Sequence, residues 1–329
     1  MTRPPLGVLL LQLGTPDAPT PAALRRYLAQ FLSDRRVIDL PRWQWLPVLY
    51  GIVLRTRPRK SAAEYAKVWT PEGAPLLVTS RRQAALVEER LTAAGVDARV
   101  RVAMRYGDPS TESALGDLEA AGVDRIVALP MYPQYASATS GSSLEDLYRA
   151  AGRRRVVPAL SVVPPYFDAP GYIDALAAVT RQSLAGWTPD HLVLSFHGIP
   201  ERYVREGDPY ASHCQATAEA LRAVMGWPST QVTASFQSRF GREVWLQPYT
   251  DATLRRLGEA RTARVAVLCP GFTADCLETI DEIGNRERHK FEAAGGGELR
   301  LVPCLNDSPA WIEAMQSMVQ GVVSGHVIV

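Results

Sequence analysis

The sequence predicts an α/β protein made of two doubly wound domains, each built on a parallel sheet. The chain has 329 residues, which is more than one typical domain contains. Short apolar runs alternate with amphipathic runs along its whole length, as expected for parallel sheets that are covered by helices on both faces. The apolar runs fall into two blocks of four, and this grouping indicates two domains of similar construction.

The predicted strands are the short apolar or half-apolar runs. Those of the first block lie at 9–13, 100–104, 126–129 and 157–163, and those of the second at 192–196, 232–236, 265–268 and 299–302. The stretch from 151 to 165 is rich in Arg and Pro, so we place the boundary there. We expect an N-terminal domain over 1–157 and a C-terminal domain over 158–305.

Helix start signals follow several of these strands. Thr20 precedes Pro21, and proline is favoured at the first helical position. The apolar residues after it are spaced i, i+3, i+4 and i+7: Leu24, Tyr27, Leu28 and Phe31. Near the C-terminus, Asn306 to Pro309 is again a helix cap followed by proline. We therefore expect a last helix over 306–322, packing back on the N-terminal domain.

One segment breaks the alternation. Residues 40–54 read LPRWQWLPVLYGIVL, which is aromatic and apolar but too short and too interrupted to span a membrane. It can be a buried loop that leads into a helix. Alternatively, Trp43 and Trp45 belong to an exposed apolar lip that covers a flat apolar ligand or touches a membrane surface.

Composition excludes several classes of protein. The formal net charge of +2 gives no reason to expect nucleic acid as a partner. The four cysteines are scattered and form no Cys-x-x-Cys pair, so neither a zinc ribbon nor a redox dithiol is indicated. The N-terminus lacks the long apolar region of a signal peptide. Isolated thiols without such a signal suit a reducing compartment, and we expect a cytoplasmic protein.

Two strand ends carry the residues best suited to chemistry. The run from Leu192 stops at His197 and a Gly-Ile-Pro corner, whereas the run from Val265 stops at a Pro-Gly corner followed by an acidic helix. Ligands bind beyond the carboxyl ends of strands in open parallel sheets, so we expect His197 and Glu278 to face one crevice. An imidazole and a carboxylate can hold a metal or move protons.

The same residues have plainer explanations. Asp275, Glu278 and Glu282 fall at i, i+3 and i+7 on one face of the expected helix, which is also the pattern of a solvated acidic face. Asp275 alone can interact with the helix dipole. A histidine in a tight loop can be purely structural. Position favours a site, because Glu278 lies one turn into a helix that begins at the carboxyl end of a strand.

Polar groups also follow the strands of the first block. The third of these strands leads into a Ser/Thr/Gly run over 136–143, whose backbone amides can cradle a phosphate. The run lacks the lysine of a Walker loop, and no G-x-G-x-x-G follows any strand. Nucleotide binding is therefore disfavoured.

Several motifs in one order resemble the ferrochelatase family over roughly Gly7 to Val319. They are Leu13-Gly14-Thr15-Pro16, Phe31-Leu32-Ser33-Asp34, Arg105-Tyr106, Pro133-Gln134-Tyr135, Thr139-Ser140-Gly141-Ser142-Ser143, Ser195-Phe196-His197-Gly198, Gly207-Asp208-Pro209-Tyr210, Trp245-Leu246-Gln247-Pro248 and Asp275-Cys276-Leu277-Glu278-Thr279. The opening QLGTPDAPTP is most similar to the Gram-negative bacterial type. The resemblance implies two Rossmann-like domains with an active-site cleft between them. The implied activity is insertion of ferrous iron into protoporphyrin IX to form haem, with release of two protons.

The resemblance also assigns roles by position. His197 matches the family's metal-side or proton-accepting histidine, Glu278 its essential carboxylate, and Glu282 the next acid of a row that passes metal or protons. A third acid present in some members is replaced here by Arg286, although Asp281 can partly compensate. The matching pocket-lining residues are Leu13, Tyr65, Arg105, Tyr106 and Trp245, and Arg105 is a candidate partner for a propionate.

We expect no cofactor beyond the iron substrate. Animal-type ferrochelatases hold an iron–sulfur cluster through three cysteines of a C-terminal extension and one in the loop that here carries Ser137, and this chain ends at Val329. The expected partners are protoporphyrin IX and Fe²⁺, with peripheral membrane contact through the Trp43/Trp45 lip, and the expected state is a monomer. The alternatives are a coproporphyrin ferrochelatase, another tetrapyrrole chelatase, and a haem- or porphyrin-binding protein without catalysis.

Overall fold

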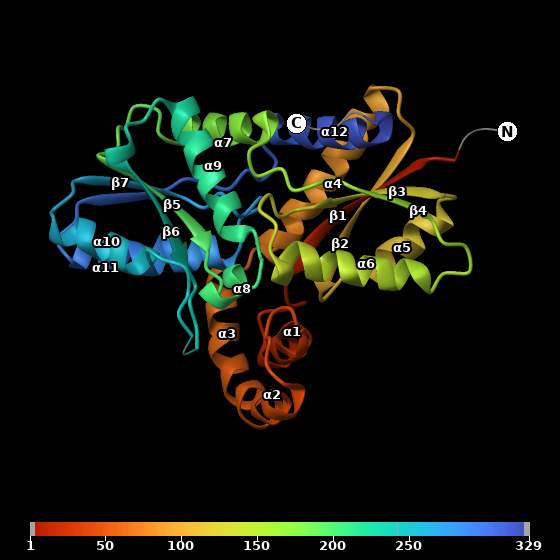
Figure 1. Ribbon diagram of the computed structural model, residues 1–329, viewed down its shortest axis with the longest axis horizontal. Coiled ribbons are helices and arrows are strands. Elements are labelled where there is room, and N and C mark those ends of the chain that lie inside the picture. The colour runs from red at the N-terminus through yellow and green to blue at the C-terminus, as the bar shows by residue number, and fades with distance from the viewer. Residues whose placement is uncertain (1–3, 242, 326–329) are drawn as a thin grey trace. The chain divides into compact units, whose positions relative to one another are not determined.

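The computed structural model describes residues 4–241 and 243–325, which form two compact units (Figure 1). The first unit takes in the chain up to Tyr132, then Ala136–Pro164, and the chain from Met315 onward. The second unit consists of Pro133–Tyr135 and Pro165–Ala314. Each unit contains one four-stranded sheet, and every strand pair is parallel. The predicted fold class, α/β with two parallel sheets, is confirmed.

The first sheet has the strand order β2-β1-β3-β4. Its strands are β1 (Leu6–Gly14), β2 (Ala98–Tyr106), β3 (Arg125–Pro130) and β4 (Ala159–Val162). The helices that pack on it are α4 (Pro75–Ala93), α5 (Thr111–Ala120) and α6 (Ser142–Gly152), the last preceded by the π-helical turn η2 (Ser137–Gly141). The central strand β1 is buried along nearly its whole length, as a strand covered on both faces must be.

A helical excursion follows β1 within the first unit. It comprises α1 (Pro21–Ser33), α2 (Arg42–Val48), the π-helix η1 (Leu49–Val53) and α3 (Leu54–Val68). Thr20 caps α1 by accepting a hydrogen bond from the backbone N–H of Ala23, as its sequence position predicts. A separate apolar cluster holds these helices together, and Leu24, Leu28, Leu49 and Leu54 are among its buried members.

The second sheet has the order β6-β5-β7-β8. Its strands are β5 (His191–His197), β6 (Val232–Gln237), β7 (Arg264–Leu268) and β8 (Glu298–Leu301). The helical elements are α7 (Pro170–Ser183), α8 (Glu201–Arg205), α9 (Tyr210–Met225), η3 (Ser229–Gln231), α10 (Thr250–Glu259), η4 (Glu278–Glu287) and α11 (Arg288–Ala293). Its core contains Val193, Leu254, Val267 and Phe291.

The C-terminal helix α12 spans Pro309–Ser324. From Met315 onward it belongs to the first unit, where Gln316 accepts a hydrogen bond from Arg90 of α4 at 2.9 Å. Contacts divide the two units between Pro164 and Pro165, and they place Pro133–Tyr135 with the second unit. Within the residues that the structure describes, no helix combines the length and the apolar character needed to cross a membrane.

Candidate active site

His197 is the last residue of β5, the strand that lies between β6 and β7. The residues before it are buried, so β5 fixes the direction in which the chain leaves the sheet. The next residue, Gly198, has little room for a side chain. A Cβ there would lie 3.0 Å from the Trp245 ring and 3.1 Å from the carbonyl oxygen of Gln237. Any larger residue at this corner would therefore require the Trp245 ring or the Gln237 backbone to shift by a few tenths of an ångström.

The imidazole of His197 has a defined orientation. Its Nδ1 lies 2.7 Å from the carbonyl oxygen of Gly198. A carbonyl can only accept, so Nδ1–H is the donor and, in the neutral ring, the lone pair is on Nε2. This tautomer leaves Nε2 able to accept a proton or to bind a metal. The Trp245 ring, which is buried, forms the wall beside it at 6.3 Å between ring centroids.

A buried amide connects the His197 strand to the acidic helix. Gln237 pairs in register with His197 across β5 and β6. Its Oε1 accepts a hydrogen bond from Ser195 at 2.6 Å, and its Nε2 donates to the backbone carbonyl of Glu278 at 3.1 Å. Both ends of the amide are therefore used to join the strand ends to the beginning of η4.

Glu278 begins η4, which is a π-helix and not the α-helix expected from the sequence. Hydrogen bonds from i to i+5 widen such a helix, and π-helical turns occur frequently at functional sites. Asp275 lies before η4 and does not share its acidic face, so that expectation is corrected. Its carboxylate instead accepts a hydrogen bond from Asn306 before α12 at 2.7 Å and one from Thr279 of η4 at 2.9 Å.

Glu282 lies four residues after Glu278 in η4, and the loop after β6 holds its carboxylate. Its Oε1 accepts from the backbone N–H of Ser238 at 3.0 Å, and its Oε2 accepts from the Ser238 hydroxyl at 2.7 Å. Burial raises the pKa of Glu282 above its usual range, and the Ser238 hydrogen bond opposes that shift. The charges of His197 and Glu278 also act on this pKa, so each of these two residues lies within electrostatic range of Glu282.

Arg286 stands where the resemblance implies a third acid, and its guanidinium faces two acids of η4. Its Nε lies 3.1 Å from Oδ2 of Asp281, whose side chain is buried, and its Nη2 lies 3.8 Å from Oε2 of Glu282. Asp281 is thus committed to an ion pair with Arg286, which argues against Asp281 as a substitute relay group. No set of three or more His, Cys, Asp or Glu side chains among residues 4–241 and 243–325 is arranged to hold a metal ion.

The remaining predicted pocket residues lie in the first unit. Leu13 of β1 and Tyr65 of α3 are partly buried and pack against the apolar cluster of the helical excursion. The Tyr65 ring meets Trp69 edge-on, with 6.4 Å between the ring centroids. Gly14 follows Leu13 with φ +113°, and a Cβ there would overlap the carbonyl oxygen of Tyr106, so only glycine permits β1 to end this close to β2.

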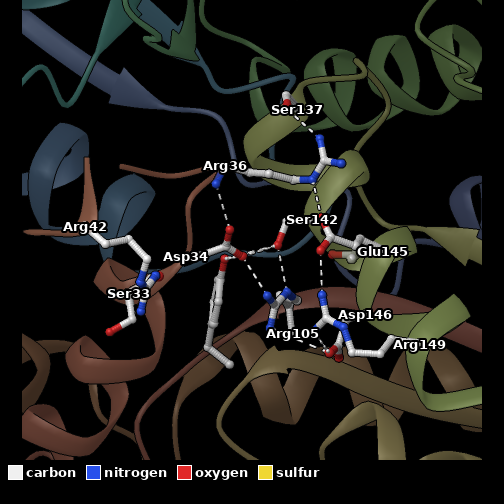
Figure 2. A network of polar contacts seen from close by, with 12 residues as sticks. Ser33, Asp34, Arg36, Arg42, Arg105, Ser137, Ser142, Glu145, Asp146 and Arg149 are labelled. Carbon is white, nitrogen blue, oxygen red and sulfur yellow. Dashed lines mark hydrogen bonds and ion pairs between the residues drawn. The ribbon is translucent and has the colours of Figure 1, made fainter. Parts of the chain in front are cut away.

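Arg105 and Tyr106 belong to a buried polar network around Asp34 (Figure 2). Oδ2 of Asp34 accepts from Nη2 of Arg105 at 2.6 Å, from the Tyr106 hydroxyl at 2.8 Å and from the Ser142 hydroxyl at 2.5 Å. Nε of Arg105 also donates to Ser142 at 2.7 Å. The guanidinium predicted for a propionate is thus engaged inside the protein, and Tyr106 is 1% exposed.

This network extends to Ser137, the position at which animal-type ferrochelatases are expected to carry a cysteine ligand of the iron–sulfur cluster. Nη1 of Arg36 donates to the Ser137 hydroxyl at 2.9 Å, and Nε of Arg36 donates to Glu145 at 2.7 Å (Figure 2). The four cysteines lie in the second unit, and all of them are buried and free: Cys214, Cys269, Cys276 and Cys304.

The segment 40–54 combines both of its predicted forms. Trp45, which was expected in the exposed lip, instead packs against the apolar cluster and donates its indole N–H to the carbonyl of Leu32 at 2.6 Å. Trp43 and Ile52, by contrast, are 77% and 60% exposed. The exposed large apolar residues of the segment, which we call the lip, are Leu40, Trp43, Val48, Tyr50 and Ile52.

The roles of Gln237 and Ser238 could not be read from the sequence. No motif marks them, and nothing in a serine signals a left-handed backbone such as the φ of +67° that Ser238 adopts. Asp34 and Ser142 lay inside recognised motifs, but only the fold shows that residues 108 positions apart share one hydrogen bond.

Comparisons with known proteins confirm the resemblance. A family model described as Ferrochelatase matches residues 5–322. A curated ferrochelatase of Chromobacterium violaceum is 49% identical over 325 residues, which cover 98% of this chain and 89% of the relative. One of Azoarcus sp. is 51% identical over 318 residues, which cover 95% and 86%. One of Bordetella pertussis is 48% identical over 321 residues, which cover 97% and 89%.

Among solved structures, SirB from Bacillus subtilis with Fe³⁺ matches with a TM-score of 0.57 and 14% identity, covering 98% of this chain and 96% of that one. The crystal structure of the sirohydrochlorin chelatase SirB from Bacillus subtilis subspecies spizizenii in complex with cobalt matches with a TM-score of 0.55 and 13% identity, covering 98% and 96%. At these identities the two matches show a shared fold.

Proposed function

Because this chain belongs to the ferrochelatase family, whose members are metal chelatases that insert iron into a porphyrin for haem synthesis, we propose that His197 and Glu278 catalyse this reaction. The proposed porphyrin is protoporphyrin IX. The observation that supports this assignment most directly is the oriented imidazole of His197, which lies within electrostatic range of Glu282 in η4. The reaction converts a porphyrin with two inner N–H groups and one Fe²⁺ into haem and two protons. Iron is the substrate here, and the protein must accept both protons.

His197 is suited to remove the first proton. The Gly198 carbonyl holds its Nδ1–H, so Nε2 presents a lone pair in the neutral ring. A ring fixed in this way needs no reorientation before it accepts a proton, which is the role of a general base. The same lone pair can contact iron during delivery.

Glu278 and Glu282 supply the negative charge for a divalent cation. Carboxylate oxygens bind Fe²⁺ weakly enough for the metal to pass on to four porphyrin nitrogens. We assign Glu278 to transient iron binding and to acceptance of the second proton after the metal has left. Glu282 lies one helical turn further from the beginning of η4 and receives iron before Glu278 in this scheme.

Apolar side chains supply the binding energy that bends the porphyrin ring. Metal insertion requires the nitrogen lone pairs to tilt out of the ring plane, a distortion of the kind that costs about 1–5 kcal/mol in bound substrates. Within the first unit, Tyr65 and Leu13 offer an aromatic and an aliphatic surface for a planar apolar ligand. Arg105 acts in this scheme by holding Asp34 and Ser142 in place, because its guanidinium already has these partners.

We also propose that the lip touches an anionic membrane surface. Its exposed apolar residues are followed by a basic stretch in α3, with Arg55, Arg57, Arg59 and Lys60 all exposed. No acidic residue lies between Asp39 and Glu64. An apolar patch beside positive charge is the usual composition of a peripheral membrane contact.

A substrate competition assay tests the choice of porphyrin. Purified protein is incubated anaerobically with Fe²⁺ and an equimolar mixture of protoporphyrin IX and coproporphyrin III, and the two haem products are separated and quantified. Preferential formation of protohaem supports the proposal. Preferential formation of coprohaem identifies the four-carboxylate ring as the substrate instead. Porphyrin binding without either product supports the carrier alternative.

A further inference from the structure

Ser238 directs two donors at one carboxylate. It is the first residue after β6, and its backbone N–H and hydroxyl bind separate oxygens of Glu282, at 3.0 and 2.7 Å. Two bonds to two different oxygens fix both the position and the plane of a carboxylate. The neighbouring Gln237 binds the backbone of Glu278. The last residue of β6 and the residue after it therefore hold the backbone of Glu278 and the carboxylate of Glu282.

The left-handed backbone of Ser238 indicates that the serine hydroxyl is needed at this position. Its φ is +67°, in the left-handed region where glycine is favoured and where other residues carry a steric cost. A glycine would provide the same backbone N–H without that cost. What serine adds is the hydroxyl, and the hydroxyl makes the shorter of the two bonds to Glu282.

We propose that Ser238 is a positioning residue for iron delivery, which holds the Glu282 carboxylate in the orientation from which Fe²⁺ passes to Glu278. This inference rests on the proposed function of Glu278 and Glu282. Arg286 contacts the same carboxylate oxygen as the Ser238 hydroxyl, at 3.8 Å, so Glu282 is held from two sides. In this scheme Ser238 acts on the iron only through Glu282.

The test separates iron use from porphyrin use. Steady-state insertion is measured anaerobically for wild type, Ser238→Ala and Ser238→Gly, varying Fe²⁺ and protoporphyrin IX in turn. Both variants keep the backbone N–H and lose the hydroxyl. We expect the KM for Fe²⁺ to rise about tenfold in each, as for loss of one hydrogen bond to a charged group. The KM for protoporphyrin IX is expected to stay within about twofold of wild type, because Ser238 does not contact that substrate in this scheme.

The glycine variant excludes a merely structural role. Glycine relieves the backbone, so its thermal midpoint should equal or exceed that of wild type while its iron KM still rises. Ser212→Ala is the matched control, because Ser212 is an exposed serine of α9 whose hydroxyl bonds only the Pro209 carbonyl among the contacts described. A glycine variant with wild-type iron KM overturns the proposal.

A double-mutant cycle identifies the group through which Ser238 acts. In a Glu282→Ala background, Ser238→Ala should change the iron KM by less than about twofold, because the carboxylate that it positions is gone. A full tenfold effect in that background overturns the assignment to Glu282. Failure of the proposed function is distinguishable, since Glu278→Gln would then retain wild-type turnover whatever the result at Ser238.

Discussion

The side-chain amide of Gln237 donates a hydrogen bond to the backbone carbonyl of Glu278 at 3.1 Å. Gln237 is 4% exposed, and the other end of its amide accepts from Ser195 of β5 at 2.6 Å. Because Gln237 also pairs in register with His197, one buried side chain links the strand that ends in the histidine to the helix that begins with the glutamate. The sheet, through Gln237, therefore fixes where the backbone of Glu278 lies relative to the end of β5.

Replacement of Gln237 by alanine should loosen this link. It leaves the buried Ser195 hydroxyl without its Gln237 acceptor, so we expect the free energy of unfolding to fall by about 1–3 kcal/mol. Chemical denaturation measures this change. Iron insertion by the folded variant should also be slower, because η4 loses its anchor. Gln182→Ala on the exposed face of α7 is the control and should change stability by less than about 0.5 kcal/mol. Equal stability of both variants would contradict the account.

Asp34→Asn should change stability in a pH-dependent way. Burial alone would raise the pKa of Asp34, but hydrogen bonds from Ser142, the Arg36 backbone and Tyr106, together with the charge of Arg105, lower it below 3.8. A depressed carboxyl pKa stabilises the fold above the unfolded value and loses that contribution as the pH falls through the folded value. Wild type should therefore lose stability below about pH 4, and Asp34→Asn should lose less over the same range.

The same substitution should be costly at neutral pH. It removes the negative partner of Arg105, a side chain that is 18% exposed, and breaking such a pair is expected to cost on the order of 3 kcal/mol. Asp17→Asn is the matched control, because Asp17 pairs with Arg26 in an ion pair of which both members are exposed. Urea unfolding at pH 7 and pH 3 measures both effects. A pH profile of stability that is the same in Asp34→Asn and in wild type would contradict the assignment.

Substitutions in the lip should weaken membrane binding without affecting the core. Trp43→Ala combined with Ile52→Ala removes the two most exposed apolar side chains of the lip. Wild type should cosediment with vesicles rich in phosphatidylglycerol and less with pure phosphatidylcholine, and the double variant with neither. Tyr148→Ala, at an exposed aromatic residue of α6, is the control. Equal sedimentation of the lip variant and the control would argue against the contact.

The positions of His197 and Glu278 relative to the strands were predicted from the residue pattern alone. Apolar runs that stop at Gly/Pro corners placed His197 at the end of β5 and Glu278 beyond β7, as observed. Helical spacing misplaced Asp275, because periodicity assumes an α-helix and η4 is a π-helix that begins three residues later. The partners of Arg105 could not be predicted from the sequence either. Asp34 and Ser142 lie 71 and 37 residues away along the chain, and only the fold brings them to Arg105.

The most direct test of the central claim is anaerobic haem formation from Fe²⁺ and protoporphyrin IX by wild type, His197→Ala and Glu278→Gln, followed by absorption. The account predicts catalytic turnover by wild type and a loss of about 10²–10⁴-fold in each variant, the usual effect of removing a general base. Exposed His289→Ala and Glu292→Gln serve as matched controls with wild-type rates. Either site variant, if folded and retaining more than about a tenth of the wild-type rate, would contradict the role of that residue.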